Sequence, residues 1–383
     1  MSWYRQLIAR QRDTIERAYA AVDERALAHK RGFCDQVVEY MRASYGLALP
    51  GAAEGGDDGG ERGERRASGG GGERGQADSA GGTGRLGSLL IFSARSDRLP
   101  RGYWQPGIVT YQPFDFDHLD RAGEYMDERV AAGENLYVRA APASADALGE
   151  RLIFSEYPAI AMTAFHEALH NRIQLPLAVE EPLHTLLALA LTAELGQRLP
   201  AGDESEARLR GWLVDGSAAL RSHYLSRAGR YAAFLQKLDP ERPDAAAING
   251  YARALLAEQR RAPGSAAQRR YGRDDAPPYS DISLNRTLHI LALEPAERDL
   301  LGTALIADYS TYERHLVAVH DVLAAHGLFD SSAGEAGEAG ESALSAILDA
   351  LFDHQVSQAE RYSFTPEAEQ AALDWLRDRI GDA

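Results

Sequence analysis

The stretch that decides the fold runs from residue 157 to residue 191 and reads YPAIAMTAFHEALHNRIQLPLAVEEPLHTLLALAL. Its centre holds two histidines four positions apart, His166 and His170, with Glu167 directly after the first. Residues four apart lie on one side of a helix, so both imidazoles can reach one metal ion. The glutamate then stands beside that ion, where it can deprotonate a metal-activated water. The pattern predicts a hydrolytic metal centre.

The residues around this pattern predict a helix. Pro158 suits a first helical turn, because its missing N–H would have no partner there anyway. The segment 159–173 contains neither glycine nor proline and is apolar on both sides of the histidines, which is typical of a buried helix. Two histidines and a glutamate are costly to bury without a partner, and a metal ion supplies one. The simpler alternative is a packed helix whose histidines only form hydrogen bonds.

A catalytic zinc ion usually has three protein ligands, so the two histidines need a third group. The metzincin extension of the motif is excluded, because Ile173 and Pro176 stand where it requires glycine and histidine. After a short connection at 175–179, the sequence predicts a second apolar helix with Pro182 in its first turn. This helix would return antiparallel to the first. Three side chains at its start are candidates for the third ligand: Glu180, Glu181 and His184.

Together the two helices resemble the core of gluzincin-type zinc metallopeptidases, and the resemblance covers about residues 150–195. Those enzymes carry the short zinc motif, a connection, and a glutamate ligand near the start of the next helix. The resemblance implies one Zn²⁺ ion with three ligands: His166, His170 and Glu181. It also implies that Glu167 is the general base and that the substrate is a peptide or protein. Two departures are Pro182, where glycine is common, and Thr185, where some members have an acidic residue that orients a histidine.

Peptide hydrolysis also needs a group that stabilises the oxyanion. Gluzincin-like enzymes take a tyrosine or histidine from the helical region downstream of the motif. In this chain the densest polar cluster on an expected downstream helix contains Tyr312 and His315. We predict these two residues as the catalytic partners of Glu167, with His223 and Tyr224 as the other option.

The segments before the motif carry strand signals. Short β-rich runs bounded by turn residues occur four times, at 89–92, 107–111, 135–138 and 151–154, and a helix is expected from 114 to about 132. These elements predict an α+β, mostly helical fold: a zincin-like small mixed sheet, then the active-site helix, then a helical C-terminal region. The helices expected in that last region are 204–234, 241–261, 283–292, 296–327, 342–358 and 366–380.

Composition divides the chain into four expected parts. Residues 1–50 form an N-terminal helical region, and 51–85 a disordered glycine-rich insertion that cannot bury enough apolar surface to order itself. Residues 86–200 form a zincin-like metal-binding domain, and 201–383 a helical C-terminal domain.

Charge and cysteine content limit the partners and the compartment. The net charge of −16 over 383 residues disfavours nucleic acid and anionic membrane surfaces, because both would repel the chain. The N-terminal sequence lacks the apolar segment of a signal peptide, and no apolar run is long enough to span a bilayer. A single cysteine excludes an internal disulfide. The sequence therefore predicts a cytoplasmic protein, and it does not give the oligomeric state.

Two further interpretations use the same residues. Glu167 with His170, and Glu181 with His184, are Glu-x-x-His pairs of the kind that di-iron carboxylate bundles use. Positions 167 and 181 are only 14 apart, which argues against such a bundle because another full helix belongs between the pairs. The second interpretation is a zincin-like scaffold or regulatory protein that has lost catalysis.

Overall fold

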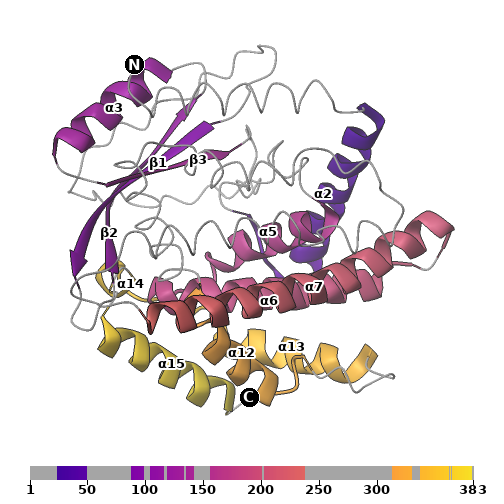
Figure 1. Ribbon diagram of the computed structural model, residues 1–383. Coiled ribbons are helices and arrows are strands. Elements are labelled where there is room, and N and C mark those ends of the chain that lie inside the picture. The colour runs from indigo at the N-terminus through magenta and orange to yellow at the C-terminus, as the bar shows by residue number, and fades with distance from the viewer. Residues whose placement is uncertain are drawn as a thin grey trace, which may run out of the picture.

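The structure is a computed structural model, and it describes residues 24–49, 88–98, 104–115, 119–132, 135–141, 156–200, 202–237, 313–329, 337–361, 363 and 365–381. The predicted motif helix is α5 (Tyr157–Leu169), and it is followed by α6 (Leu177–Arg198) and α7 (Glu204–Leu235). These three helices pack on one another across the middle of the molecule (Figure 1). They position the candidate site.

Helix α6 begins earlier than the sequence predicted. It starts at Leu177, inside the expected connection, because the Pro176 carbonyl accepts backbone hydrogen bonds from the N–H groups of Val179 and Glu180. Pro182 consequently lies inside the helix and not in its first turn. The earlier start places both acidic residues of the predicted ligand pair on the helix, next to the end of α5.

Helix α7 approaches both motif helices closely at two glycine positions. A Cβ atom at Gly216 would lie 2.5 Å from Pro158 Cγ, and one at Gly196 of α6 would lie 2.8 Å from Leu213 Cβ. Glycine is needed at both positions because a side chain would collide with the neighbouring helix. The prediction of a helix at 204–234 is confirmed.

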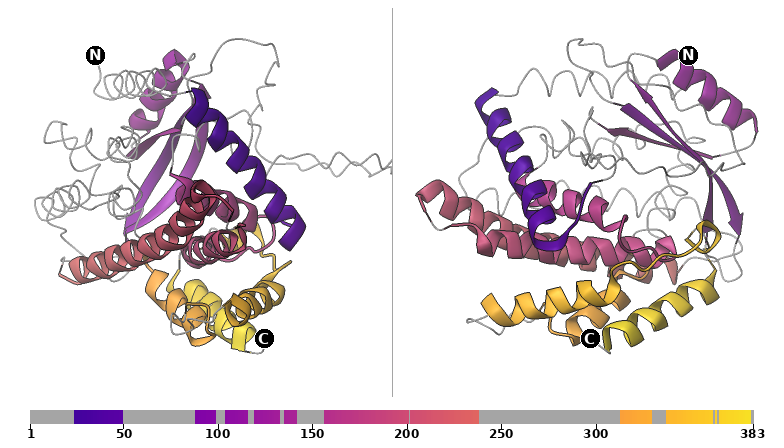
Figure 2. Two further views of the ribbon diagram at one scale, coloured as in Figure 1. Left: turned by 90° about the vertical axis from the view of Figure 1, so that its right-hand side faces the viewer. Right: turned by 180° about the vertical axis from the view of Figure 1, so that it is seen from behind.

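A second layer of helices covers the opposite side of α6. It contains α12 (Leu316–Ala325), α13 (Gly337–Leu351), the short α14 (Gln358–Arg361) and α15 (Pro366–Gly381). Helices α12, α13 and α15 all contact α6, and Figure 2 shows this layer from two further sides. Helix α6 is thus buried between two layers, which explains why it is apolar nearly all round.

One hydrophobic core joins these helices to α2 (Glu24–Tyr45). It extends from Phe33 in α2 to Ile380 in α15, and Phe165 of the motif helix lies fully buried within it. The four-part division of the chain stays a prediction, but residues from three of those parts share this core. Among the described helices, none is both long enough and apolar enough to cross a membrane.

The expected helix at 342–358 ends with α13, and the chain then turns toward the motif. Asp353 adopts a positive φ of 65°, and its N–H donates to the Arg172 carbonyl at 2.8 Å. Gln174 N–H in turn donates to the His354 carbonyl at 2.8 Å. These two bonds attach the C-terminal segment to the connection between α5 and α6. The expected helix 366–380 is confirmed as α15.

Several predicted elements lie outside the described residues. They are the helices at 241–261 and 283–292, the first part of the helix at 296–327, and the strand at 151–154.

The prediction of an α+β fold with a zincin-like mixed sheet is wrong. The body that carries the motif is built from helices, and α5 packs mainly on α2, α6 and α7. The three described strands, β1 (Ser88–Arg98), β2 (Trp104–Asp115) and β3 (Asn135–Ala141), pair only antiparallel, in the order β2-β1-β3, and pack against α3 (Leu119–Ala131). Strand-forming residues do not encode the direction of pairing, and the short link between β1 and β2 produces a hairpin.

Helix α2 is attached to α6 by a buried carboxylate. Glu194 of α6 is 4% exposed. It accepts hydrogen bonds from the hydroxyl of Tyr40 at 3.0 Å and from that of Tyr45, and it pairs with Arg198 at 2.6 Å. Burial and the adjacent carboxylate raise the pKa of both tyrosines, so each hydroxyl keeps the proton that it donates.

We expect Tyr45→Phe to lower the free energy of unfolding by about 1.5–3 kcal/mol, because Glu194 loses a hydrogen bond to a buried charge. Urea unfolding followed by circular dichroism measures the change. Tyr224→Phe is the matched control, since the Tyr224 hydroxyl forms no hydrogen bond within the described part of the chain. Equal effects of the two substitutions would show that this carboxylate does not hold α2 in place.

Candidate metal centre

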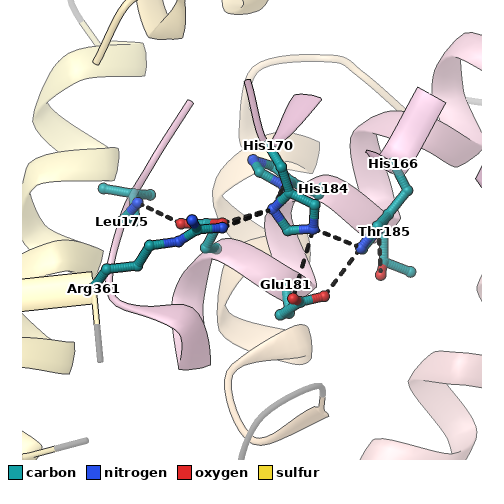
Figure 3. Close-up of polar contacts among 8 residues, drawn as sticks. His166, His170, Leu175, Glu181, His184, Thr185 and Arg361 are labelled. Atoms are coloured by element: carbon teal, nitrogen blue, oxygen red, sulfur yellow. Dashed lines mark hydrogen bonds and ion pairs between the residues drawn. The ribbon is translucent and has the colours of Figure 1, made fainter. Parts of the chain in front are cut away.

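Three ligand-type side chains converge, as Figure 3 shows: His166 of α5, His170 at the C-cap of α5, and Glu181 of α6. His166 Nε2 lies 3.2 Å from His170 Nε2 and 3.0 Å from Glu181 Oε2, and His170 Nε2 lies 3.6 Å from Glu181 Oε1. The side chains are 14%, 16% and 11% exposed, respectively. The group is therefore largely shielded from bulk water, but each of the three side chains keeps a small exposed fraction.

These separations match the ligand shell of one zinc ion. Tetrahedral zinc with bonds of 2.0–2.1 Å places neighbouring ligand atoms about 3.3 Å apart. The two imidazole nitrogens are 3.2 Å apart, and they lie 3.0 and 3.6 Å from the two different oxygens of Glu181, so all three separations are close to that value. Two imidazole nitrogens and one carboxylate are also a common ligand set of catalytic zinc. The residues present thus fit the ion that the sequence predicted.

Glu180 orients His170 toward this point. Its Oε1 lies 2.6 Å from His170 Nδ1, and because an ionised carboxylate can only accept, His170 Nδ1 is the donor. In the neutral imidazole this leaves a lone pair on Nε2, directed at His166 and Glu181, which is the state that binds a metal. A carboxylate behind a ligand histidine is a recurrent way of fixing its tautomer and ring orientation.

Thr185 stands behind the other histidine. Its Oγ1 lies 3.5 Å from His166 Nδ1, one turn of α6 beyond Glu181. The Thr185 hydroxyl therefore lies beside the ring nitrogen of His166 that faces away from the ligand group. Contacts that pair His170 with Glu180, and His166 with Glu181 and Thr185, also show that α5 and α6 run antiparallel, as predicted.

A second group forms on the other side of His170. It contains Glu180 and His184, whose Nδ1 lies 3.1 Å from His170 Nδ1. Arg361 of α14 enters this group, with Nη2 2.6 Å from Glu180 Oε1 and 3.3 Å from His170 Nδ1. The positive charge of the Arg361 guanidinium opposes the binding of a metal ion in this second group. The second group is therefore a buried ion pair, and it supports the ligand group of His166, His170 and Glu181.

Glu180 is the centre of that ion pair. It is fully buried, and its second oxygen accepts the backbone N–H of Leu175 at 2.8 Å. Its carboxylate thus holds α6, the connection before α6, and α14 together. This is why Glu180 and Glu181, adjacent in sequence, have different surroundings.

Charges within the site shift several pKa values. Burial opposes the charged form of His170, but its hydrogen bond to Glu180 and the carboxylates of Glu181, Glu180 and Glu167 raise its pKa. Burial likewise opposes ionisation of Glu181, but the hydrogen bond and charge of His166 and the charges of His170 and Arg361 lower its pKa. Burial, followed by the charges of His170 and His166, lowers the pKa of His184 well below its usual range, so His184 is neutral.

Glu167 remains free to act on a water molecule. It is half-buried, and its carboxylate accepts no hydrogen bond from any residue that the structure describes. Its charge contributes to the raised pKa of His170, and it directly follows the candidate ligand His166 in α5. A carboxylate that adjoins a metal ligand and has no other described hydrogen-bond partner is suited to act as a general base.

Of the two predicted oxyanion groups, only His315 lies within the described residues, and it is not grouped with the candidate metal ligands. Tyr312 lies outside the described residues. His315 donates from Nε2 to Glu369 at 2.7 Å, beside the pair of Arg314 with the same carboxylate. Within the described ranges His315 joins neither ligand group. His223 and Tyr224, the other option, form a ring contact with each other.

The two Glu-x-x-His pairs of the di-iron interpretation also do not form a shared ligand group among the described residues. Glu181 joins His166 and His170, whereas His184 joins Glu180 on the far side of His170. Glu167 belongs to neither ligand group found among the described residues.

Comparison with known proteins adds no name to this site. No protein-family model, curated protein or solved structure matches the chain. The assignment below consequently depends on the geometry and on the sequence motif.

Sequence reasoning missed Arg361 and the supporting role of Glu180. Arg361 stands 191 positions from His170 within a short helix that has no recognisable motif, so no local signal links it to the site. The role of Glu180 could have been found from the acid pair: residues adjacent on a helix point in different directions, so only one of them can meet the histidines in the same way.

Proposed function

We propose that the protein is a zinc-dependent metallohydrolase that cleaves peptide bonds. The observation that carries this proposal is the convergence of His166 Nε2, His170 Nε2 and the Glu181 carboxylate at separations suited to one zinc ion. The resemblance of the two-helix motif to gluzincin peptidases supports a peptide or protein as the substrate. The Glu167 carboxylate has no described hydrogen-bond partner, which supports a hydrolytic metal site rather than a purely structural one.

In this mechanism each residue of the site would have a separate role. His166, His170 and Glu181 hold the ion, while Glu180 and Thr185 fix the two imidazoles. A bound zinc ion would polarise the substrate carbonyl and make the attacking water more acidic. Glu167 accepts a proton as the water oxygen bonds to the carbonyl carbon, and it then passes that proton to the amide nitrogen. The C–N bond breaks, which leaves a carboxylate and an amine.

We further propose a cytoplasmic setting and no nucleic-acid partner. The single cysteine suits a reducing compartment, and the net charge of −16 opposes polyanions.

A peptide library tests the proposal. We expect the full-length, zinc-loaded protein to cleave a subset of a mixed-sequence library, with products identified by mass spectrometry. Addition of 1,10-phenanthroline should stop cleavage and added zinc should restore it, because the chemistry needs the ion. The non-chelating 1,7-isomer is the matched control and should have no effect. One zinc per chain without cleavage of any peptide would contradict the enzymatic part and favour a binding or regulatory protein.

A further inference from the structure

A pocket of about 690 Å³ lies between α7 and α12, apart from the candidate metal centre. One wall is a stripe of α7 that carries Arg221, Ser222 and Ser226. The facing wall is a stripe of α12 with His320, and Phe329 from the turn after α12 also lines the pocket. None of these residues takes part in the site described above.

The pocket contains a cation without a counter-ion. The Arg221 guanidinium lies 4.2 Å above the ring of Phe329, and in the described part of the chain it forms neither a hydrogen bond nor an ion pair. Burial lowers its pKa, which reflects the loss of water around the guanidinium. A half-buried arginine in a chain with a net charge of −16 would ordinarily find a carboxylate. Its five N–H donors have no acceptor among the described residues.

Further hydrogen-bond donors line the same pocket. The hydroxyls of Ser222 and Ser226 stand one turn apart on α7, and no described group bonds to either of them. His320 supplies an imidazole, whose Nδ1 lies 3.6 Å from the exposed carboxylate of Asp321. An arginine, an imidazole and two hydroxyls are donor groups that suit the three terminal oxygens of a phosphate monoester, which accept more hydrogen bonds than the two oxygens of a carboxylate.

The other groups that line the pocket are apolar or aromatic. The rings of His320 and Phe329 are stacked, with their planes 4° apart and centroids 5.1 Å apart. Val317, 43% exposed, stands at the rim. A flat apolar group attached to the anion could pack against this surface.

We propose that this pocket binds a small molecule that carries a phosphate group on an aromatic or similarly flat body. The proposal does not depend on the hydrolytic function.

Phenyl phosphate is the probe. Isothermal titration calorimetry of the protein in phosphate-free buffer should show that one phenyl phosphate molecule binds per chain. Arg221→Gln should weaken binding about tenfold or more, because it removes charge-assisted hydrogen bonds. Arg210→Gln, at an exposed position on the same helix, is the matched control and should leave binding unchanged. Thermal melting of both variants checks that they are folded.

Two further arms give the outcomes that would overturn the proposal. His166→Ala should keep full binding, and loss of binding in this variant with retention in Arg221→Gln would move the phosphate to the candidate metal centre. Benzoate carries the same ring on a carboxylate and should bind more weakly. Equal or tighter binding of benzoate, or no heat from phenyl phosphate at about 10 mM, would exclude a phosphate site between α7 and α12.

Discussion

Glu167→Gln should lower the rate of peptide cleavage by about 10²–10⁴-fold while the zinc content stays at that of the wild type. The glutamine keeps the size of the side chain but cannot accept the proton of the attacking water. The charge of Glu167 contributes to the raised pKa of His170. Its carboxylate accepts no hydrogen bond from the described residues, so the substitution breaks none of the described hydrogen bonds. The measurement pairs kcat on a library-derived peptide with elemental analysis of the same sample.

The matched control for that experiment is Glu204→Gln, an exposed glutamate at the start of α7. It should leave both kcat and zinc content unchanged. Full activity of Glu167→Gln would remove the general base from the mechanism, and loss of zinc from this variant would mean that Glu167 is a ligand.

Arg361→Leu should lower the free energy of unfolding by about 3 kcal/mol, because it leaves the fully buried carboxylate of Glu180 without its counter-ion. The Arg361 side chain is itself 17% exposed, so the loss should lie at the lower end of what breaking a buried pair costs. Urea unfolding in the presence of a chelator measures the change, since bound metal would otherwise add its own stabilisation.

Arg377→Leu supplies the comparison for Arg361→Leu. Arg377 pairs with Asp374 at 2.6 Å on the surface of α15, where the two side chains are 47% and 57% exposed. Exposed pairs contribute about 1 kcal/mol or less. If Arg361→Leu lowered the free energy of unfolding by no more than Arg377→Leu, the pair of Arg361 with Glu180 would not stabilise the site.

The motif and the two helices around it were predictable because their signals are local. The spacing of His166 and His170 fixes their common face, and Pro158 marks the start of α5. The start of α6 was predicted too late, since a proline normally marks a first turn and Pro182 lies deeper in this helix.

Non-local features were not predictable from one sequence. The antiparallel pairing of the three strands depends on which segments meet, and the α+β, zincin-like expectation failed there. The end of α13 depends on Asp353 and on the bonds of its segment to Arg172 and Gln174. The same contact brings Arg361 to Glu180, so the C-terminal residues reach the candidate site through tertiary structure alone.

The most direct test of the central claim is elemental mass spectrometry of the purified full-length protein beside His166→Ala. We expect one zinc per wild-type chain and none in the variant, because His170 and Glu181 alone leave the ion with only two of its three protein ligands. Absence of metal from the wild type after incubation with zinc would reduce the three converging side chains to a hydrogen-bonded cluster. Two irons per chain would contradict the single-ion site and restore the carboxylate-bridged alternative.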